Sequence, residues 1–192
     1  NVGPTTSAVG GDVDINAGEA GETGGAVRVS AGKSLHTGGD VRVRAGEGGS
    51  GSGGALEMRG GDAGSDGGIV SIAGGASSLA AGGSVSVAGG IGVTGGDVTI
   101  EAGFGSEQDG GRLSLSSGAS NTGESGGVIL ESSSAVPQSG DVSVRTGEAA
   151  TSGALLLETG NAGTSGSVRI AAGTSEVGDG ATVSVTAGGA QT

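Results

Sequence analysis

Two pairs of acidic residues are the groups in this sequence best suited to binding a ligand. Asp62 lies four residues before Asp66, and Glu107 lies two residues before Asp109, in both cases within a polar loop that contains glycine. Carboxylate and carbonyl oxygens are the ligands that Ca²⁺ prefers. The Gly-Gly-x-Gly-x-Asp spacing of calcium-binding repeats does not occur around them. We therefore interpret these residues as solubilising and predict no metal site, with calcium binding as the alternative.

The sequence has no set of side chains that resembles catalytic machinery. His36 is its one histidine, it lies in a polar loop, and no cysteine or tyrosine is present to act with it. Acid–base and nucleophilic catalysis need two or more such groups within hydrogen-bond distance of each other. Structural zinc sites need cysteine or several histidines. We predict that the protein is not an enzyme and that it uses no cofactor.

The composition indicates a soluble chain that lacks an ordinary core. Glycine contributes 49 of the 192 residues, aromatic residues only 1%, and the net charge is −12. This charge disfavours nucleic acids and anionic membrane surfaces as partners, and no apolar run is long enough to insert into a membrane. Hydrophobic residues make up 33% of the chain, and they recur at fixed distances from glycine pairs. That regularity argues against a flexible linker.

A repeat of about 14 residues organises almost the whole chain. Each unit reads Gly-Gly-a-b-c-d-e-f-Gly and is followed by a short polar loop. Serine replaces the first glycine in some units, and Ala181 replaces the second glycine in the last unit. Thirteen units begin at Gly10, Gly24, Gly38, Gly53, Gly67, Gly82, Gly95, Gly110, Ser125, Ser139, Ser152, Ser165 and Gly180.

Positions b and d are apolar in every unit, position f is small, and positions a, c and e are mostly polar. This alternation has the period of a β-strand, with b, d and f on one side. Most b and d residues are β-branched, which favours a strand, and we expect the flanking glycines to turn the chain at positive φ. The b/d pairs are Val13/Ile15, Val27/Val29, Val41/Val43, Leu56/Met58, Val70/Ile72, Val85/Val87, Val98/Ile100, Leu113/Leu115, Val128/Leu130, Val142/Val144, Leu155/Leu157, Val168/Ile170 and Val183/Val185.

The pattern predicts an all-β fold, a parallel β-solenoid (β-helix) formed by residues 10–192, with residues 1–9 as a leader or connecting segment. One strand cannot bury its apolar face alone, so we expect copies to stack in register. Two units per coil are favoured because facing sheets let valine and isoleucine pack together. One unit per coil is the alternative. Side chains at b, such as Val98, are then predicted to be buried and those at c, such as Thr99, exposed.

The outward positions allow two further interpretations. All seven arginines fall on a, c or e, where they would form ladders with carboxylates of neighbouring units or, alternatively, a strip that contacts glycans or other anions. Threonine or serine precedes many of the glycine pairs, and a flat threonine array could bind ice, but the column at c is irregular and partly charged. Ice binding is therefore an alternative function. The arginines are Arg28, Arg42, Arg44, Arg59, Arg112, Arg145 and Arg169.

Three segments carry a resemblance to known repeats: residues 38–46 (GGDVRVRAG), 95–103 (GGDVTIEAG) and 165–173 (SGSVRIAAG). They resemble the Gly/Ser/Thr-rich repeat arrays of large secreted or cell-surface proteins in microalgae such as diatoms. More loosely, they are similar to the β-helical stems of filamentous-haemagglutinin-type adhesins. The resemblance covers the chain from Gly10 onward. It implies an extracellular or cell-surface structural role, and it carries over no site residues.

Together these features predict a non-catalytic structural module of an extracellular fibre, cell wall or adhesive. A ligand-binding solenoid, with ice or calcium as the ligand, is the alternative. Neither end of the repeat carries an evident cap, so we expect the segment to belong to a longer array, within one chain or end to end between chains. The expected partners are further copies of the repeat, with glycans or surfaces as the alternative.

Overall fold

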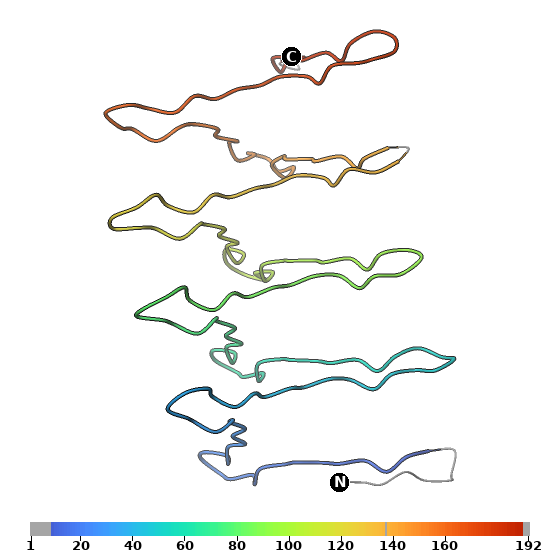
Figure 1. Ribbon diagram of the computed structural model, residues 1–192, viewed down its shortest axis with the longest axis vertical. Helices are drawn as coiled ribbons and strands as arrows, with labels where there is room; N and C mark the ends of the chain where they lie inside the picture. The colour runs from blue at the N-terminus through green and yellow to red at the C-terminus, as the bar shows by residue number, and fades with distance from the viewer. Residues whose placement is uncertain (1–8, 137, 190–192) are drawn as a thin grey trace. The chain divides into compact units, whose positions relative to one another are not determined.

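The computed structural model describes residues 9–136 and 138–189, and none of these residues belongs to a helix or a β-strand. Figure 1 shows extended runs that alternate with rounded loops, with neither a helical ribbon nor a strand arrow. The described part thus contains no helix that could cross a membrane. The chain divides into two units, Asn1–Thr99 and Ile100–Thr192. Of the predicted leader, residues 1–8 lie outside the described residues.

The extended runs correspond to positions a to e of the repeat, and they occur in both units of the chain. β-Branched residues at b and d favour extended backbone at these positions. No described residue other than glycine has a positive φ. Residues 26–31 of the first unit and 112–117 of the second, for example, form neither helix nor strand. The described backbone at these positions agrees with the alternation in having no helix and no positive φ at residues other than glycine, but it contains no strand.

The predicted parallel β-solenoid is wrong. No backbone ladder joins one extended run to another among the described residues, so they form no sheet and no coil of either one or two repeats. A pattern of period two specifies extended backbone, but it does not specify a partner strand. Most runs have only two large apolar side chains with which to contact a neighbouring run. The many glycines of the chain raise the conformational entropy that would be lost if the backbone were ordered into a sheet. The runs therefore stay unpaired.

The predicted burial of the b positions is also wrong, because no described side chain is buried. The b residues are 47–68% exposed and the d residues 58–92% exposed. Val98 is 49% exposed, and its neighbour Thr99 is exposed as well. The whole chain exposes 19214 Å², whereas a compact protein of this length would expose about 7,900 Å². The apolar side chains therefore face solvent.

Backbone hydrogen bonds close the loops between the extended runs. In eight loops the second glycine of a repeat donates its N–H to the carbonyl of the glycine that ended the preceding repeat, at 2.8–2.9 Å. The two glycines of each bond are six to eight residues apart. The bonds run from Gly25 to Gly18, Gly39 to Gly32, Gly54 to Gly46, Gly68 to Gly61, Gly83 to Gly75, Gly96 to Gly90, Gly111 to Gly103 and Gly126 to Gly118.

Amide hydrogen exchange should separate these two kinds of backbone. A bond with a net value of about 1 kcal/mol slows exchange roughly fivefold, so we expect that degree of protection at Gly25, Gly68 and Gly111. The N–H groups of the b and d residues should exchange as in an unstructured peptide. Two-dimensional NMR after transfer into D₂O measures both. Strong protection across the b and d positions would show that the extended runs are paired after all.

Candidate functional site: loop necks and exposed apolar pairs

Each closed loop has a neck made of three positions. They are the small residue at f, the glycine that follows it, and the second glycine of the next repeat, which donates the hydrogen bond. The side chain at f lies against this second glycine: a Cβ built on Gly25 would be 3.2 Å from the Cβ of Ala17. Position f was predicted to share an inward face with b and d. The structure shows instead that f is small because it adjoins the neck.

The second glycine of each pair is required because its backbone approaches the neck closely. A Cβ added at this position in the eight closed loops would lie 2.7–3.4 Å from the nearest atom, closest at Gly68. At the first glycine of the pair the nearest atom is 3.4 Å or farther away. This difference explains why serine replaces the first glycine, as at Ser125, while the second is retained in all eight.

The flanking glycines do not serve the purpose predicted from the sequence. They were expected to turn the chain at positive φ, but Gly178, with φ of 86°, is the one described glycine in that region. The remaining described glycines adopt backbone conformations that other residues can reach. Lack of a side chain, rather than backbone freedom, is therefore what the closed loops require of glycine.

A three-position rule separates closed loops from open ones. All eight closed loops have alanine, glycine or serine at f, glycine after it, and glycine as the second residue of the next repeat. The four later loops lack the bond in the part of the chain that the structure describes, and each departs from this rule once. The departures are Ser133 after f, Thr146 and Thr159 at f, and Ala181 in place of the second glycine.

Serine side chains shape several of the loops. Three hydroxyls accept backbone N–H groups two or three residues ahead: Ser34 from His36, Ser77 from Leu79 and Ala80, and Ser120 from Thr122 and Gly123, at 2.8–3.4 Å. Ser175 donates instead to the carbonyl of Val177 at 2.8 Å. Each of the four serines stands two residues after the glycine that ends its repeat. Every other loop has alanine or glycine at this position. This column of small residues, which would have located the turns, was not predicted.

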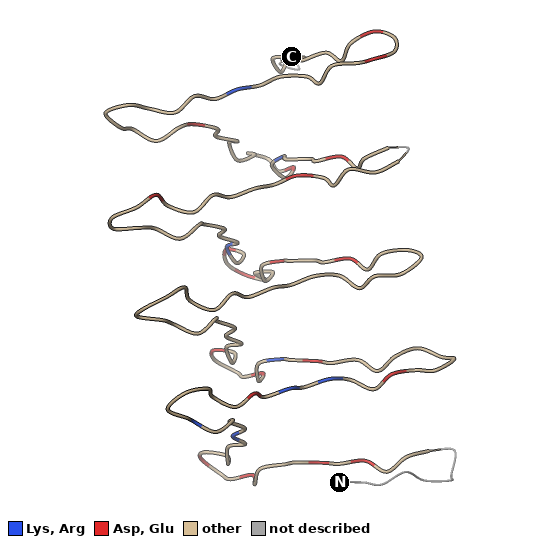
Figure 2. Ribbon diagram, in the orientation of Figure 1, with Lys and Arg blue, Asp and Glu red and all other residues tan. Residues whose placement is uncertain are grey.

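Two ion pairs are present among the described residues, and each lies within one repeat or its adjoining loop. Arg42 contacts Asp40 at 2.5 Å, and Arg59 contacts Asp62 at 2.8 Å. Figure 2 shows the other charged residues on both sides of a long uncharged stretch, residues 67–96. The ladders expected between neighbouring repeats need a stacked sheet, which is absent. Arginines therefore pair locally where they pair at all.

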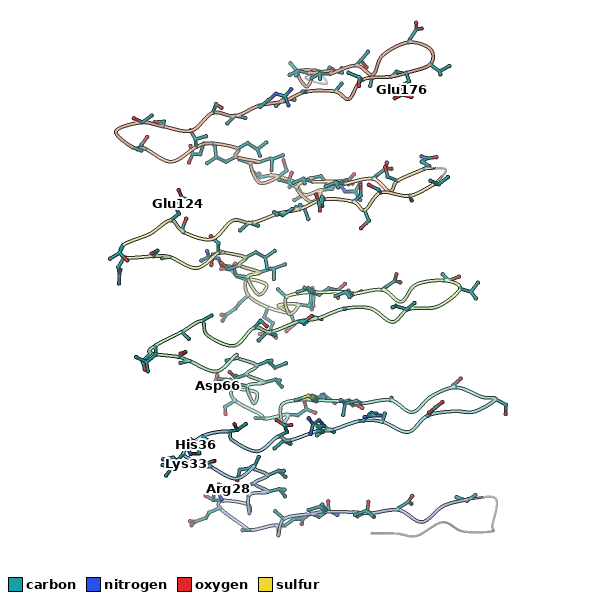
Figure 3. All side chains as sticks on the ribbon, in the orientation of Figure 1. Arg28, Lys33, His36, Asp66, Glu124 and Glu176 are labelled. Carbon is teal, nitrogen blue, oxygen red and sulfur yellow. The ribbon has the colours of Figure 1, made fainter. Side chains whose placement is uncertain are left out.

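The calcium candidates do not assemble into a cluster. One Nη2 atom of Arg59 binds both carboxylate oxygens of Asp62, at 2.8 and 3.0 Å. Asp66 extends from the same loop (Figure 3). In the described part of the chain no three acidic or histidine residues gather where they could hold a metal ion, so Glu107 and Asp109 also belong to no such group.

His36 and the one recorded hollow offer no reactive arrangement. His36 is exposed, and Lys33 projects from the same loop (Figure 3). A hollow of about 310 Å³ is lined by four consecutive residues, 145–148. Arg145 and Glu148 line this hollow, but they are not among the ion pairs of the described residues. Comparison with protein-family models, with curated proteins and with solved structures finds no match for this chain.

The neck rule predicts that an open loop can be closed by one substitution. Thr146→Ser gives the tenth loop the f residue of a closed loop, Ser117, so the N–H of Gly153 should bond to the carbonyl of Gly147. Thr146→Val keeps the branched shape of threonine and should leave the loop open. Hydrogen exchange at Gly153 should slow roughly fivefold in the serine variant only. If valine closes the loop equally well, the size of f does not control the neck.

Proposed function

We propose that this protein is a non-catalytic structural module of an extracellular fibre, cell wall or adhesive, and that it works by associating with further copies of the repeat. The observation that carries the proposal is the exposure of the b/d pairs. Thirteen such pairs recur along the chain, and every member is at least 47% exposed. Soluble monomers rarely expose apolar surface this regularly, and surfaces of this kind usually mark interaction sites.

The necks support the proposal because they set the distance between one apolar pair and the next. Each closed loop brings the end of one extended run within a hydrogen bond of the start of the following run. The chain therefore presents one exposed pair of apolar side chains per repeat, at nearly even intervals along the sequence, to a binding partner. Such a series suits binding through many weak contacts, whose combined strength grows with the number of repeats engaged. That property is useful in a fibre or an adhesive.

The charge distribution fits the same role. Every described charged residue is exposed, and in most repeats a polar loop follows the apolar pair. A net charge of −12 keeps separate chains soluble by mutual repulsion. Association then depends on whether apolar burial outweighs this repulsion. The resemblance to secreted and cell-surface repeat arrays supports placing the module outside the cell.

Removing apolar side chains from b should weaken association more than removing the same side chains from loops. The test compares Val98→Ser/Val142→Ser with Val136→Ser/Val177→Ser, which have identical compositions. Full burial of a valine contributes about 1.5–3 kcal/mol, and the b side chains are already half covered. We therefore expect the dissociation constant of the first variant to rise about tenfold and that of the second to change less than twofold.

Sedimentation velocity over a concentration series of the purified chain measures both constants. A wild-type chain that sediments as a monomer at every concentration would contradict the proposed function. Equal weakening by both variants would show that the b positions are not the contact. A parallel titration with Ca²⁺ tests the alternative function, since a ligand-binding module would respond to the ion and a self-associating one would not need it.

Ionic strength should change association in a predictable direction. Because the copies carry the same net charge, added salt screens their repulsion. We expect the dissociation constant to fall as NaCl is raised from about one tenth molar to about one molar, where the screening length shortens from roughly 10 Å to 3 Å. Sedimentation in the two buffers provides the measurement. A contact made by pairing of opposite charges would weaken instead.

A further inference from the structure

Residues 67–96 form a neutral window in an acidic chain. The window contains no Asp, Glu, Lys, Arg or His, and it is the longest stretch of the sequence without charge. Asp66 and Asp97 border it directly. Figure 2 shows this part of the chain, which runs from teal to green in Figure 1, free of both charge colours. The window lies entirely within the unit Asn1–Thr99.

The window also exposes apolar side chains beyond its b/d pairs. Its two repeats carry the b/d pairs Val70/Ile72 and Val85/Val87, which are 47–75% exposed. Apolar residues occupy its outward and loop positions as well, where most repeats have polar ones. These additional residues are Ile69, Leu79, Ile91 and Val93, and each is more than 90% exposed.

The backbone of the window is available for pairing. Its recorded backbone bonds are those of the necks at Gly68, Gly83 and Gly96, together with the serine turn at Ser77. No recorded bond involves the N–H groups of residues 69–73 or 84–88. β-Branched, uncharged segments without proline, whose backbone is unpaired, are those that pair most readily with an identical segment.

Charge decides which partner fits this surface. Most repeats outside the window carry acidic residues, so two copies that meet through the same repeat bring like charges together, and that contact is unfavourable. Two windows brought together meet no like charge and cover each other's apolar side chains. An acidic or basic partner would gain nothing from a surface without charge. The window is therefore matched best by the same window of a second copy.

We infer that residues 67–96 form a homotypic contact in which two copies of this chain associate first, through the extended runs at 69–73 and 84–88. The inference rests on the proposed self-association and assigns it to one segment. Association begins at the neutral window because repulsion is weakest there. The other repeats contribute once the copies are held together, since later contacts are then intramolecular.

Charged residues placed in the window test the inference against a matched control. Ser71→Asp/Ser86→Asp adds a carboxylate at c of both window repeats, and Ser114→Asp/Ser143→Asp adds the same two charges at c of repeats outside it. Like charges that face each other across paired segments destabilise them. We expect the dissociation constant in sedimentation velocity to rise about fivefold or more for the window variant and less than twofold for the control.

A lysine variant distinguishes local contact from overall charge. Ser71→Lys/Ser86→Lys makes the chain less acidic, so a purely global effect would strengthen association. A homotypic contact brings lysine toward lysine, and the dissociation constant should rise as it does for the aspartate variant. Stronger association of the lysine variant would overturn the inference, because it would show that the window meets an acidic region instead.

Disulfide capture provides a second readout, since the natural chain contains no cysteine. Ser84→Cys in the window and Ser167→Cys outside it both occupy position a. Under mild oxidation the window variant should form covalent dimers faster. If the wild type associates but both aspartate variants weaken it equally, or both cysteine variants couple at the same rate, the window is not the contact and self-association stands. If the wild type stays monomeric, the proposed function itself fails.

Discussion

The structure depends on one short contact, a backbone hydrogen bond between two glycines that closes the loop after each of eight repeats. The bond forms only where two conditions are met. The residue at f, which precedes the accepting glycine, is small, and the donating residue is a glycine, which has no side chain to obstruct the approach. Its net value is about 1 kcal/mol, whereas closing a seven-residue loop costs about 1.7 kcal/mol plus a constant. The stiffness of the β-branched runs and the serine turns within the loops reduce the freedom that closure must remove.

Because closure is local, it arranges the apolar pairs without burying them. The least exposed described residues are small ones at or near the loops, namely Ala45, Gly48, Gly60, Gly89 and Gly105. In an ordinary domain the most covered positions would be large apolar side chains. Here the ordering contact and the apolar surface occupy different positions of the repeat. That separation leaves the apolar pairs free to contact another molecule, which is the physical basis of the proposed module.

The repeat and the sites of its turns follow from the sequence, whereas the predicted solenoid is wrong. Alternation at Val98 and Ile100 determines local backbone, because β-branched side chains limit the torsions of their own residues. Pairing depends on whether another run gains enough to offset its entropy, and no residue type encodes that gain. The prediction that position f faces inward with b and d is wrong for a related reason. A small residue suits both an interior face and a loop neck. Only the residue next to it in space, such as Gly25 beside Ala17, decides between the two.

Variation among the repeats becomes informative once the neck geometry is known. Ser125, in the first position of its glycine pair, occupies a place where other repeats leave 3.4 Å or more of space, and its loop closes normally. Ala181, in the second position, places a methyl group where closed loops allow 2.7–3.4 Å, and its loop stays open. The same chemical change, gain of a small side chain, therefore has opposite consequences at adjacent residues.

The open loops all follow Gly126, so the second unit of the chain, Ile100–Thr192, contains both kinds of loop. Every described loop that lies wholly within the first unit is closed. Loop closure is thus set repeat by repeat, and a chain built this way can vary the stiffness of its connections without altering the apolar pairs that they separate.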